Sequence, residues 1–229
     1  MKTIGLIGGL SWHSTIDYYR VLNETVGALE GGVSSAKILM YSVNFAEIKA
    51  LTFNDDWDGI SRIICDIAKK LEAAGADCLL LGANTMHKIA DEVQAAIGIP
   101  LIHIAKVTAA AITQKQLRKV ALLGTKYTME LGFYQEKLSA AGIETIIPAD
   151  EDRVFINNAI YEEMGAGIFL PATRDRFHEI IEIMLSGGAE GIILGCTEIP
   201  ILLKDTVAAV PFFDTGYIHS IAAVDYALS

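Results

Sequence analysis

Short runs of consecutive apolar residues alternate along the whole chain with longer amphipathic segments. The runs are rich in β-branched residues or leucine, and consecutive apolar positions are typical of strands that are buried on both faces of a parallel sheet. They span residues 3–8, 37–43, 77–82, 100–105, 120–125, 144–149, 191–196 and 210–215. Between them lie segments such as 57–75, where isoleucine, alanine and leucine recur at helical spacing before Gly75. The pattern predicts an α/β fold.

The runs can also be paired between the two halves of the chain in the same order. Three pairs of segments resemble each other at offsets of 116, 113 and 111, namely 5–9 with 121–125, 74–89 with 187–202, and 98–105 with 209–216. Any two βα units share some likeness, but three matches in one order with drifting offsets favour an internal duplication. We therefore predict two pseudo-symmetric Rossmann-like lobes, each with a central four-stranded, mostly parallel sheet flanked by helices. The first lobe is expected to hold residues 1–104 and 217–229, and the second residues 105–216.

Composition narrows the classes of protein that fit. The chain has 229 residues, of which 52% are hydrophobic, and this is enough to bury a substantial core. Its formal net charge of −10 would repel a phosphate backbone, so nucleic acid is not expected as a partner. No apolar stretch is long enough to span a membrane and the opening residues show no cleavage pattern of an export signal, so we expect a soluble protein that is not exported. Its three cysteines, an odd number without a CxxC pair, favour the reducing cytoplasm over a disulfide framework.

Ligands of open parallel sheets bind beyond the carboxyl ends of the strands, so the residues that directly follow each run are the candidates for a site. These are Gly8, Gly9, Leu10, Ser11, Ala83, Asn84, Thr85, Gly124, Thr125, Thr128, Cys196, Thr197 and Glu198. Under the duplication, Ala83 and Cys196 occupy matching positions. Two lobes that close on one small molecule in the cleft between them would place these positions on opposite faces of it.

Such an arrangement suits the inversion of a stereocentre. Without a cofactor, one acid/base group must remove the Cα proton and another must deliver a proton to the opposite face. A thiol fits this task, because its pKa of about 8.5 is lowered at a helix N-terminus. Cys196 precedes a segment in which we expect a helix to begin, although a free cysteine can also be a buried apolar filler. Asn84, Thr85 and Thr197 would hold carboxylate oxygens, and Glu198 would orient an ammonium group or shuttle a proton.

Four motifs make the comparison specific: GLIGGLSWHST (5–15), NTMHK (84–88), ALLGTKYTM (121–129) and GCTEI (195–199). In order and spacing they resemble the aspartate/glutamate racemase family over nearly the whole chain. The resemblance implies a cofactor-independent two-base mechanism, acidic amino acids as substrates, and homodimers. It also implies that Cys196 is the second catalytic cysteine, which acts on the L-enantiomer. Position 83 would hold the first catalytic residue, which is usually cysteine and in some members threonine.

The chain departs from this family pattern in two places. Ala83 has no ionisable group, so either this is a natural one-thiol member or the chain was altered to disarm the enzyme, and racemisation should be poor in both cases. Some aspartate-specific members present a basic side chain to the distal carboxylate. The two stretches that we can align with these members, residues 49–54 and 162–169, contain a single basic side chain, that of Lys49. Thr52 is therefore the candidate for a polar contact with the substrate.

Other sites and functions are less well supported by the residues. The five histidines show no metal-ligand spacing, so we expect no metal, and His87 is equally well explained as a cap or packing residue. The glycines of residues 5–9 do not fit GxGxxG, and neither a GxSxG elbow nor a Walker lysine motif occurs. Cys65 and Cys78 fall within helix and strand patterns. Two alternatives stay open: a single-thiol decarboxylase or cis-trans isomerase of the same superfamily, and an amino-acid-binding or regulatory module without catalysis.

Overall fold

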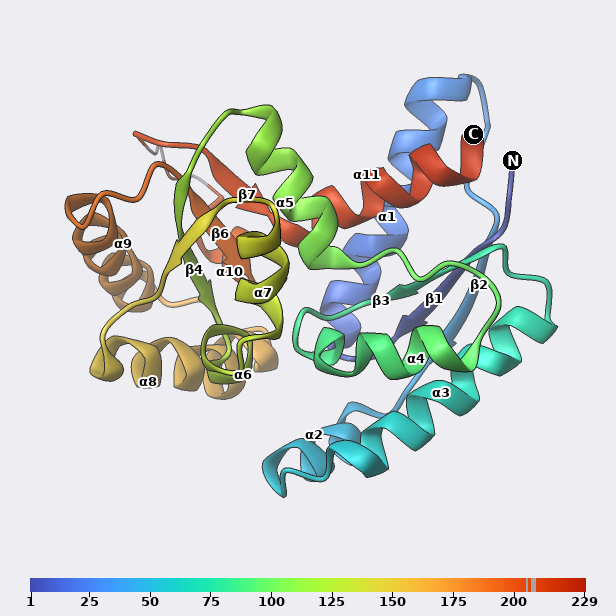
Figure 1. Ribbon diagram of the computed structural model, residues 1–229, viewed down its shortest axis with the longest axis horizontal. Coiled ribbons are helices and arrows are strands. Elements are labelled where there is room, and N and C mark those ends of the chain that lie inside the picture. Colours follow the sequence, from blue (N-terminus) through green and yellow to red (C-terminus); the bar gives the residue numbers. More distant parts are fainter. Residues whose placement is uncertain (205, 207–208) are drawn as a thin grey trace. The chain divides into compact units, whose positions relative to one another are not determined.

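A computed structural model describes residues 1–204, 206 and 209–229 and divides into two compact units (Figure 1). The first unit comprises Met1–His103 and His219–Ser229, and the second comprises Ile104–Ile218. Each unit has its own parallel sheet with helices packed on it, which confirms the predicted α/β class with two lobes. Helix α11 (Thr215–Leu228) starts in the second unit and ends in the first. Among the described residues, no helix is both long and apolar enough to cross a bilayer.

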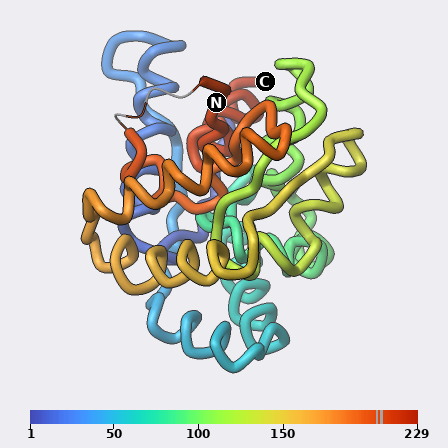
Figure 2. The backbone as a smooth tube through the Cα atoms, turned by 90° about the vertical axis from the view of Figure 1, so that its left-hand side faces the viewer, coloured from blue at the N-terminus to red at the C-terminus, as the bar shows by residue number. Residues whose placement is uncertain are grey.

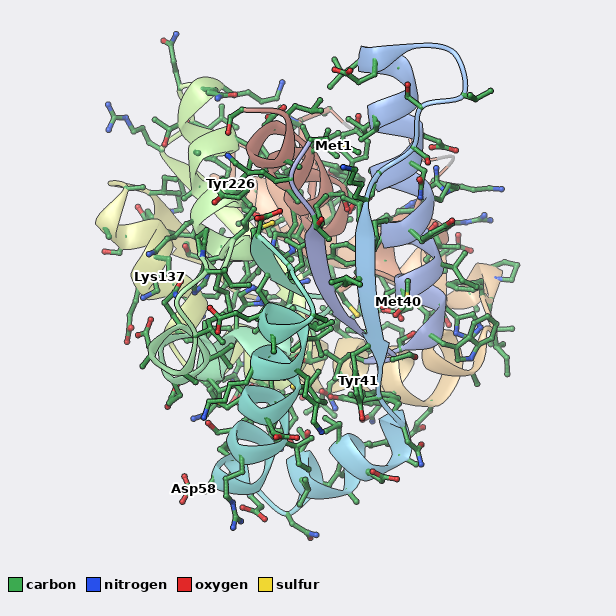
Figure 3. The ribbon with its side chains drawn as sticks, turned by 90° about the vertical axis from the view of Figure 1, so that its right-hand side faces the viewer. Met1, Met40, Tyr41, Asp58, Lys137 and Tyr226 are labelled. Carbon is green, nitrogen blue, oxygen red and sulfur yellow. The ribbon has the colours of Figure 1, made fainter. Side chains whose placement is uncertain are left out.

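The sheet of the first unit has the order β2-β1-β3. Its strands are β1 (Ile4–Gly8), β2 (Ile38–Ser42) and β3 (Cys78–Leu81), and both pairings of the central strand β1 are parallel. Strands β1 and β3 are buried along their whole length, as their consecutive apolar residues predict. Strand β2 lies at the edge, and its Met40 and Tyr41 are 41% and 40% exposed (Figure 3).

Successive strand residues point to opposite faces of this sheet, and each face has its own helices. On one face, Ile4, Leu6, Cys78 and Leu80 pack against α11 and α1 (Trp12–Glu30). On the other face, Ile7, Leu79 and Leu81 pack against α3 (Trp57–Ala73) and α4 (Ala90–Ala96). The remaining elements of the unit are α2 (Phe45–Phe53) and the 3₁₀ helix η1 (Thr85–Ile89). Apolar residues at helical spacing on α3 thus meet the consecutive apolar residues of the strands.

The predicted strand over residues 100–105 is wrong. This segment forms a single parallel bridge, between Leu101 and Leu79, and α5 (Ile104–Gln114) begins immediately afterwards. The two ladder bonds run from Leu79 N to Pro100 O at 2.9 Å and from Ile102 N to Leu79 O at 3.0 Å. Because the early start of α5 turns the backbone away, the first sheet has three strands where four were predicted.

The sheet of the second unit has the order β5-β4-β6-β7, with all pairings parallel. Its strands are β4 (Lys119–Gly124), β5 (Glu144–Ile146), β6 (Ile192–Gly195) and β7 (Phe212–Asp214). Besides α5, its helices are α6 (Lys126–Glu130), α7 (Phe133–Ala140), α8 (Asp150–Asn158), α9 (Pro171–Ser186) and α10 (Ile199–Leu202), with a π-helix η2 (Ala159–Glu163) and a 3₁₀ turn η3 (Met164–Ala166) after α8. The four strands confirm the predicted count for this lobe.

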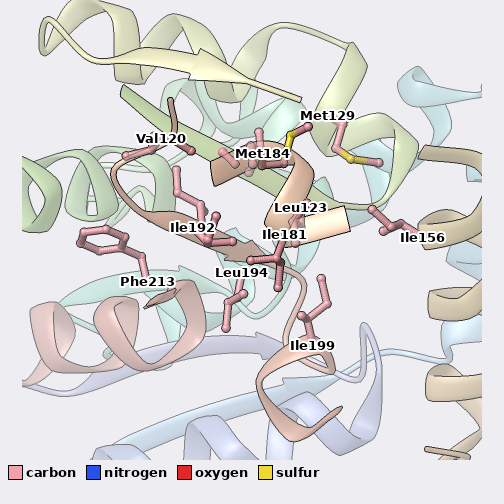
Figure 4. Close-up of a cluster of buried hydrophobic side chains, with 14 of the residues drawn as sticks. Val120, Leu123, Met129, Ile156, Ile181, Met184, Ile192, Leu194, Ile199 and Phe213 are labelled. Carbon is pink, nitrogen blue, oxygen red and sulfur yellow. The ribbon is translucent and has the colours of Figure 1, made fainter. Parts of the chain in front are cut away.

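Helices cover both faces of the second sheet. In Figure 1, α9 lies on one side of the sheet, and α5 and α7 lie together on the other. Figure 2 shows α8 and α9 side by side, and an ion pair from Arg176 to Asp152 at 2.5 Å joins them. Between the layers, one cluster of buried side chains includes Ile192 and Phe213 (Figure 4).

The two units repeat one topology, as the duplication predicts. The central strands β1 and β4 each pair on one side with the next strand along the chain and on the other with β3 or β6. In both units, an acidic residue just before β3 or β6 accepts a hydrogen bond from the main chain near the start of the central strand. Asp77 accepts from Thr3 N at 2.6 Å, and Glu190 accepts from Arg118 N at 2.6 Å. This shared detail lies at the offset of 113 that relates the two segments in the sequence.

Candidate functional site

Cys196 follows β6 directly, at the carboxyl end of the second sheet. Its Sγ donates a hydrogen bond to Oε2 of Glu198 at 3.0 Å, and Oγ1 of Thr197 donates to the same oxygen at 2.9 Å. Glu198 is buried at 4% exposure, whereas Cys196 and Thr197 are half-buried. Two consecutive side chains therefore donate to one carboxylate oxygen of the residue that follows them.

The environment of Cys196 raises the pKa of its thiol well above the usual value. Burial is the main cause, and the negative charge and hydrogen bond of Glu198 raise the pKa further. Backbone N–H groups of Glu198 and Thr197 act in the opposite direction. The expected lowering of the thiol pKa by a following helix is wrong, because α10 is only four residues long and burial outweighs the backbone N–H groups of Thr197 and Glu198.

The loop after β4 lies beside the loop after β6. Gly124 and Gly195 are register partners at the ends of these adjacent strands, so the residues that follow them start from neighbouring points. Thr125 accepts a hydrogen bond from Thr128 N at 3.3 Å, and the hydroxyls of the two threonines lie 3.2 Å apart. Both threonines are buried. Thr125 is thus the N-cap of α6, and this role accounts for its side chain whether or not it also contacts a ligand.

Tyr161 is a residue that sequence reasoning missed. It lies in the π-helix η2, and irregular helical turns of this kind are frequent at functional sites. Burial raises the pKa of its hydroxyl, and the charges of Cys196, Tyr127 and Glu198 raise it further. The hydroxyl therefore stays protonated near the thiol. Neither the apolar pattern nor a motif singles out this tyrosine, because its proximity to Cys196 depends on the path of the chain between β5 and β6.

In the first unit, the loop after β1 has an unusual backbone. Gly9 has φ +75°, and its N–H donates to Oγ1 of Thr15 at 2.8 Å. Ser11 has φ +129°, which is rare for a residue with a side chain and indicates local strain. Its Oγ is buried and has no hydrogen-bond partner among the described residues. Strain and an unsatisfied buried hydroxyl at the end of a central strand are features of a ligand-binding loop.

The loop after β3 contains the predicted position 83. Ala83 is half-buried and packs against the apolar core of this unit, while Asn84 and Thr85 are buried at 4% and 8% exposure. His87 is also buried, and its Nδ1 donates to the carbonyl oxygen of Ala83 at 3.0 Å. Burial lowers the pKa of His87 to about 4, which keeps this imidazole neutral at physiological pH.

Two further residues that we predicted for the substrate site make contacts within the first unit. Leu10 is buried in the apolar core of the first unit. Thr52 is buried on α2, where its hydroxyl donates to the carbonyl oxygen of Ile48 at 2.8 Å. Lys49 lies on the same helix with its Nζ 5.5 Å from the centre of the Phe53 ring. The expectation that Ala83 and Cys196 act on one molecule stays a prediction, because the two positions belong to different units.

This chain resembles known proteins over most of its length. The family model for Asp/Glu/hydantoin racemases matches residues 7–223, which include the whole second unit, most of the first unit, and all four motifs except the first two residues of the motif at 5–15. The chain belongs to this racemase family. The resemblance inferred from the motifs is therefore confirmed.

Individual relatives agree with the family assignment. A crystal structure from Yersinia pestis, described as a candidate Asp/Glu racemase, is 49% identical and superimposes with a TM-score of 0.93 over 100% of both chains. An aspartate racemase homologue from Pyrococcus horikoshii is 34% identical, with a TM-score of 0.85 and 100% coverage of both chains. The broad-specificity amino-acid racemase RacX of Bacillus subtilis is 29% identical over 70% of this chain and 69% of its own. These relatives support an amino-acid racemase, an isomerase.

Proposed function

We propose that this racemase acts on acidic amino acids, and that the Cys196 thiolate removes the Cα proton of the L-enantiomer. The hydrogen bond from Cys196 Sγ to Glu198 Oε2 at 3.0 Å is the observation that carries the proposal. Since the thiol is the nucleophilic base only when deprotonated, it needs an acceptor for its own proton. Glu198 is placed to be that acceptor.

The steps then balance without a cofactor. The thiol proton moves from Cys196 to Glu198, and the thiolate takes the Cα proton, which leaves a carbanion next to the substrate carboxylate. Return of a proton to the opposite face completes inversion. Thr197, beside the thiol, would donate to the substrate carboxylate once the substrate displaces its bond to Glu198. Ser11, Thr52, Asn84, Thr85, Thr125 and Thr128 are the further polar contacts that we propose.

Alanine at position 83 sets the expected outcome of this reaction. Alanine carries no proton to deliver, so the second face has no acid at the position where the family places one. We therefore propose that the chain exchanges the Cα hydrogen of an L-amino acid mainly with retention of configuration. Inversion should be slow, because it has to use a proton from water or a less suitable donor.

Proton NMR of L-aspartate and L-glutamate in deuterated water tests the proposal. The unaltered chain should incorporate deuterium at Cα with little D-enantiomer, and Ala83→Cys should produce the D-enantiomer. Ala83→Thr is the second variant, and Cys196→Ala is the control that should abolish exchange. If the chain and Ala83→Cys both leave the Cα hydrogen in place, the proposed function is wrong.

Ala83 also favours a second candidate function, a decarboxylase or cis-trans isomerase that needs one thiol beside a carbanion. Turnover of a substituted malonate or of maleate by the unaltered chain, together with inert aspartate and glutamate, would favour this function. Tight binding of an acidic amino acid without either reaction would instead indicate a binding module.

A homodimer is a further proposal. Strand β2 is the edge of a three-stranded sheet, and Met40 and Tyr41 expose apolar surface along it (Figure 3). Proteins usually cover or blunt such an edge. Sedimentation analysis of the chain and of a Met40→Lys, Tyr41→Lys double variant tests this proposal, since a dimer formed through this edge should dissociate in the variant.

The proposed location of the protein is the cytoplasm.

A further inference from the structure

The first unit contains a group of buried polar side chains that the proposed reaction does not use. Tyr18, His87 and His219 are 2%, 2% and 0% exposed, and they come from α1, η1 and α11. The rings of His87 and His219 meet edge to face, with centres 5.5 Å apart and planes at 70°. We refer to these three residues as the histidine brace.

Hydrogen bonds fix the proton positions of His219. Its Nε2 lies 2.6 Å from the carbonyl oxygen of Ile102, and since a carbonyl only accepts, this nitrogen carries the proton. Its Nδ1 is therefore an acceptor in the neutral ring, and it accepts from the Tyr18 hydroxyl at 2.7 Å. Burial lowers the pKa of His219 to about 3, in agreement with a neutral ring held by two specific bonds.

The other end of the brace reaches position 83. His87 Nδ1 donates to the carbonyl oxygen of Ala83, and the His87 ring packs edge to face against the His219 ring. Hydrogen bonds and this ring contact together connect α1, α11 and the loop after β3.

The second unit shows that the fold does not require these histidines. At the offset of 116, Tyr18 corresponds to Tyr134, whose buried hydroxyl donates to Thr108 Oγ1 at 3.2 Å. At the offset of 111, Thr108 corresponds to His219. In the second unit, tyrosine bonds to threonine between α7 and α5. In the first unit, tyrosine bonds to histidine between the equivalent helices α1 and α11.

The two units differ even more clearly at the position of His87. At the offset of 113 it corresponds to Pro200, which has neither a side-chain donor nor a backbone N–H. Pro200 therefore cannot donate to the carbonyl oxygen of Cys196, as His87 does to that of Ala83. Buried polar groups are costly unless every one is satisfied, so the presence of the two buried histidines in one copy alone calls for a role at that copy's loop.

We propose that His87 and His219, with Tyr18, are positioning residues that hold the main chain at position 83 for proton transfer. This inference rests on the proposed function, since it assigns position 83 the second acid/base role. The brace acts through the carbonyl of residue 83 and does not itself exchange protons with the substrate. In a chain with a thiol at position 83, loosening the brace should misplace that thiol while Cys196 keeps its own surroundings.

The test uses Ala83→Cys as the parent and measures deuterium exchange from each enantiomer separately. Adding His87→Ala should slow exchange from the D-enantiomer about 10- to 100-fold, as expected for a misplaced catalytic group, and leave exchange from the L-enantiomer near the parent rate. His87→Gln keeps an N–H donor and should restore part of the loss. Tyr134→Phe is the matched control, because it removes the equivalent buried hydroxyl bond in the other unit, and it should not slow D-exchange selectively.

Equal slowing from both enantiomers, or the same selective slowing in Tyr134→Phe, would overturn the proposal. A second measurement does not depend on activity: the alkylation rate of the thiol introduced by Ala83→Cys, followed by peptide mass spectrometry. His87→Ala should change this rate several-fold and Tyr134→Phe should not. If the parent exchanges neither enantiomer, the proposed function fails, and the alkylation rates alone decide whether the brace holds position 83; an unchanged rate overturns it.

Discussion

Cys196 Sγ and Glu198 Oε2 lie 3.0 Å apart, with the thiol donating to a carboxylate that is itself buried. Burial and this carboxylate together raise the pKa of the thiol, so the resting enzyme keeps Cys196 protonated. In the proposed reaction, the same contact would provide a destination for the thiol proton. A high pKa and a ready acceptor are thus two consequences of one geometry.

Glu198→Gln separates these consequences. The amide keeps a hydrogen-bonding group but removes the negative charge, so the pKa of Cys196 should fall. If Glu198 receives the thiol proton, Cα exchange from L-aspartate should nevertheless slow by about 10²- to 10⁴-fold. The measurements are the pH profile of Cys196 alkylation, followed by peptide mass spectrometry, and exchange by NMR. Thr197→Val is the control for loss of the other bond to the carboxylate; exchange that speeds up in Glu198→Gln would contradict the role of Glu198.

Acid should weaken the fold through the histidine brace. The pKa of His87 is lowered to about 4 and that of His219 to about 3, while both should titrate near 6.5 in the unfolded chain. Below about pH 6.5 the unfolded state therefore binds more protons than the folded state, and stability falls progressively as the pH drops toward 4 and 3. Urea titrations at pH 7.5 and pH 5 should show the loss, which His219→Thr should reduce. An identical pH dependence in that variant would contradict the assignment.

Gly9→Ala should be strongly destabilising. A Cβ at Gly9 would collide with the backbone oxygen and nitrogen of Val43, and the residue has φ +75°. Gly31 has the same φ of +75° but open space around it, so Gly31→Ala reports the cost of the backbone conformation alone, about 1 kcal/mol. We expect Gly9→Ala to lower the free energy of unfolding by at least about 2 kcal/mol more than Gly31→Ala. Equal effects in urea titration would show that the loop after β1 gives way easily.

The apolar core of the second unit should respond to loss of side-chain volume. Ile192 is fully buried in this cluster (Figure 4), and it is the register partner of Phe212 on the neighbouring strand. Ile192→Ala should destabilise the fold by about 2–5 kcal/mol, and Ile192→Val by about 0.5–1.5 kcal/mol. Ile183 lies on α9 at 51% exposure, so Ile183→Ala is the surface control with a change of about 0.5 kcal/mol or less. Thermal unfolding of the three variants gives the order.

Much of this protein could be predicted from local patterns. Seven of the eight strands predicted from consecutive apolar residues are present in the structure. Burial on both faces of a parallel sheet requires apolar side chains at neighbouring positions, and this requirement is visible in the sequence. The segment 100–105 has the same composition and forms only one bridge. What distinguishes it is the onset of α5 at Ile104, which depends on how that helix packs.

The candidate site divides in the same way. Sequence alone determined the family, the place of Cys196 at a strand end, and the presence of alanine at the matching position 83, since each is a matter of residue type and spacing. Only the tertiary structure decided that the thiol pKa rises, that Tyr161 lies near it, and that Tyr18 bonds to His219 across 201 positions of the chain. Desolvation and long-range contacts belong to the packed state, and no local pattern encodes them.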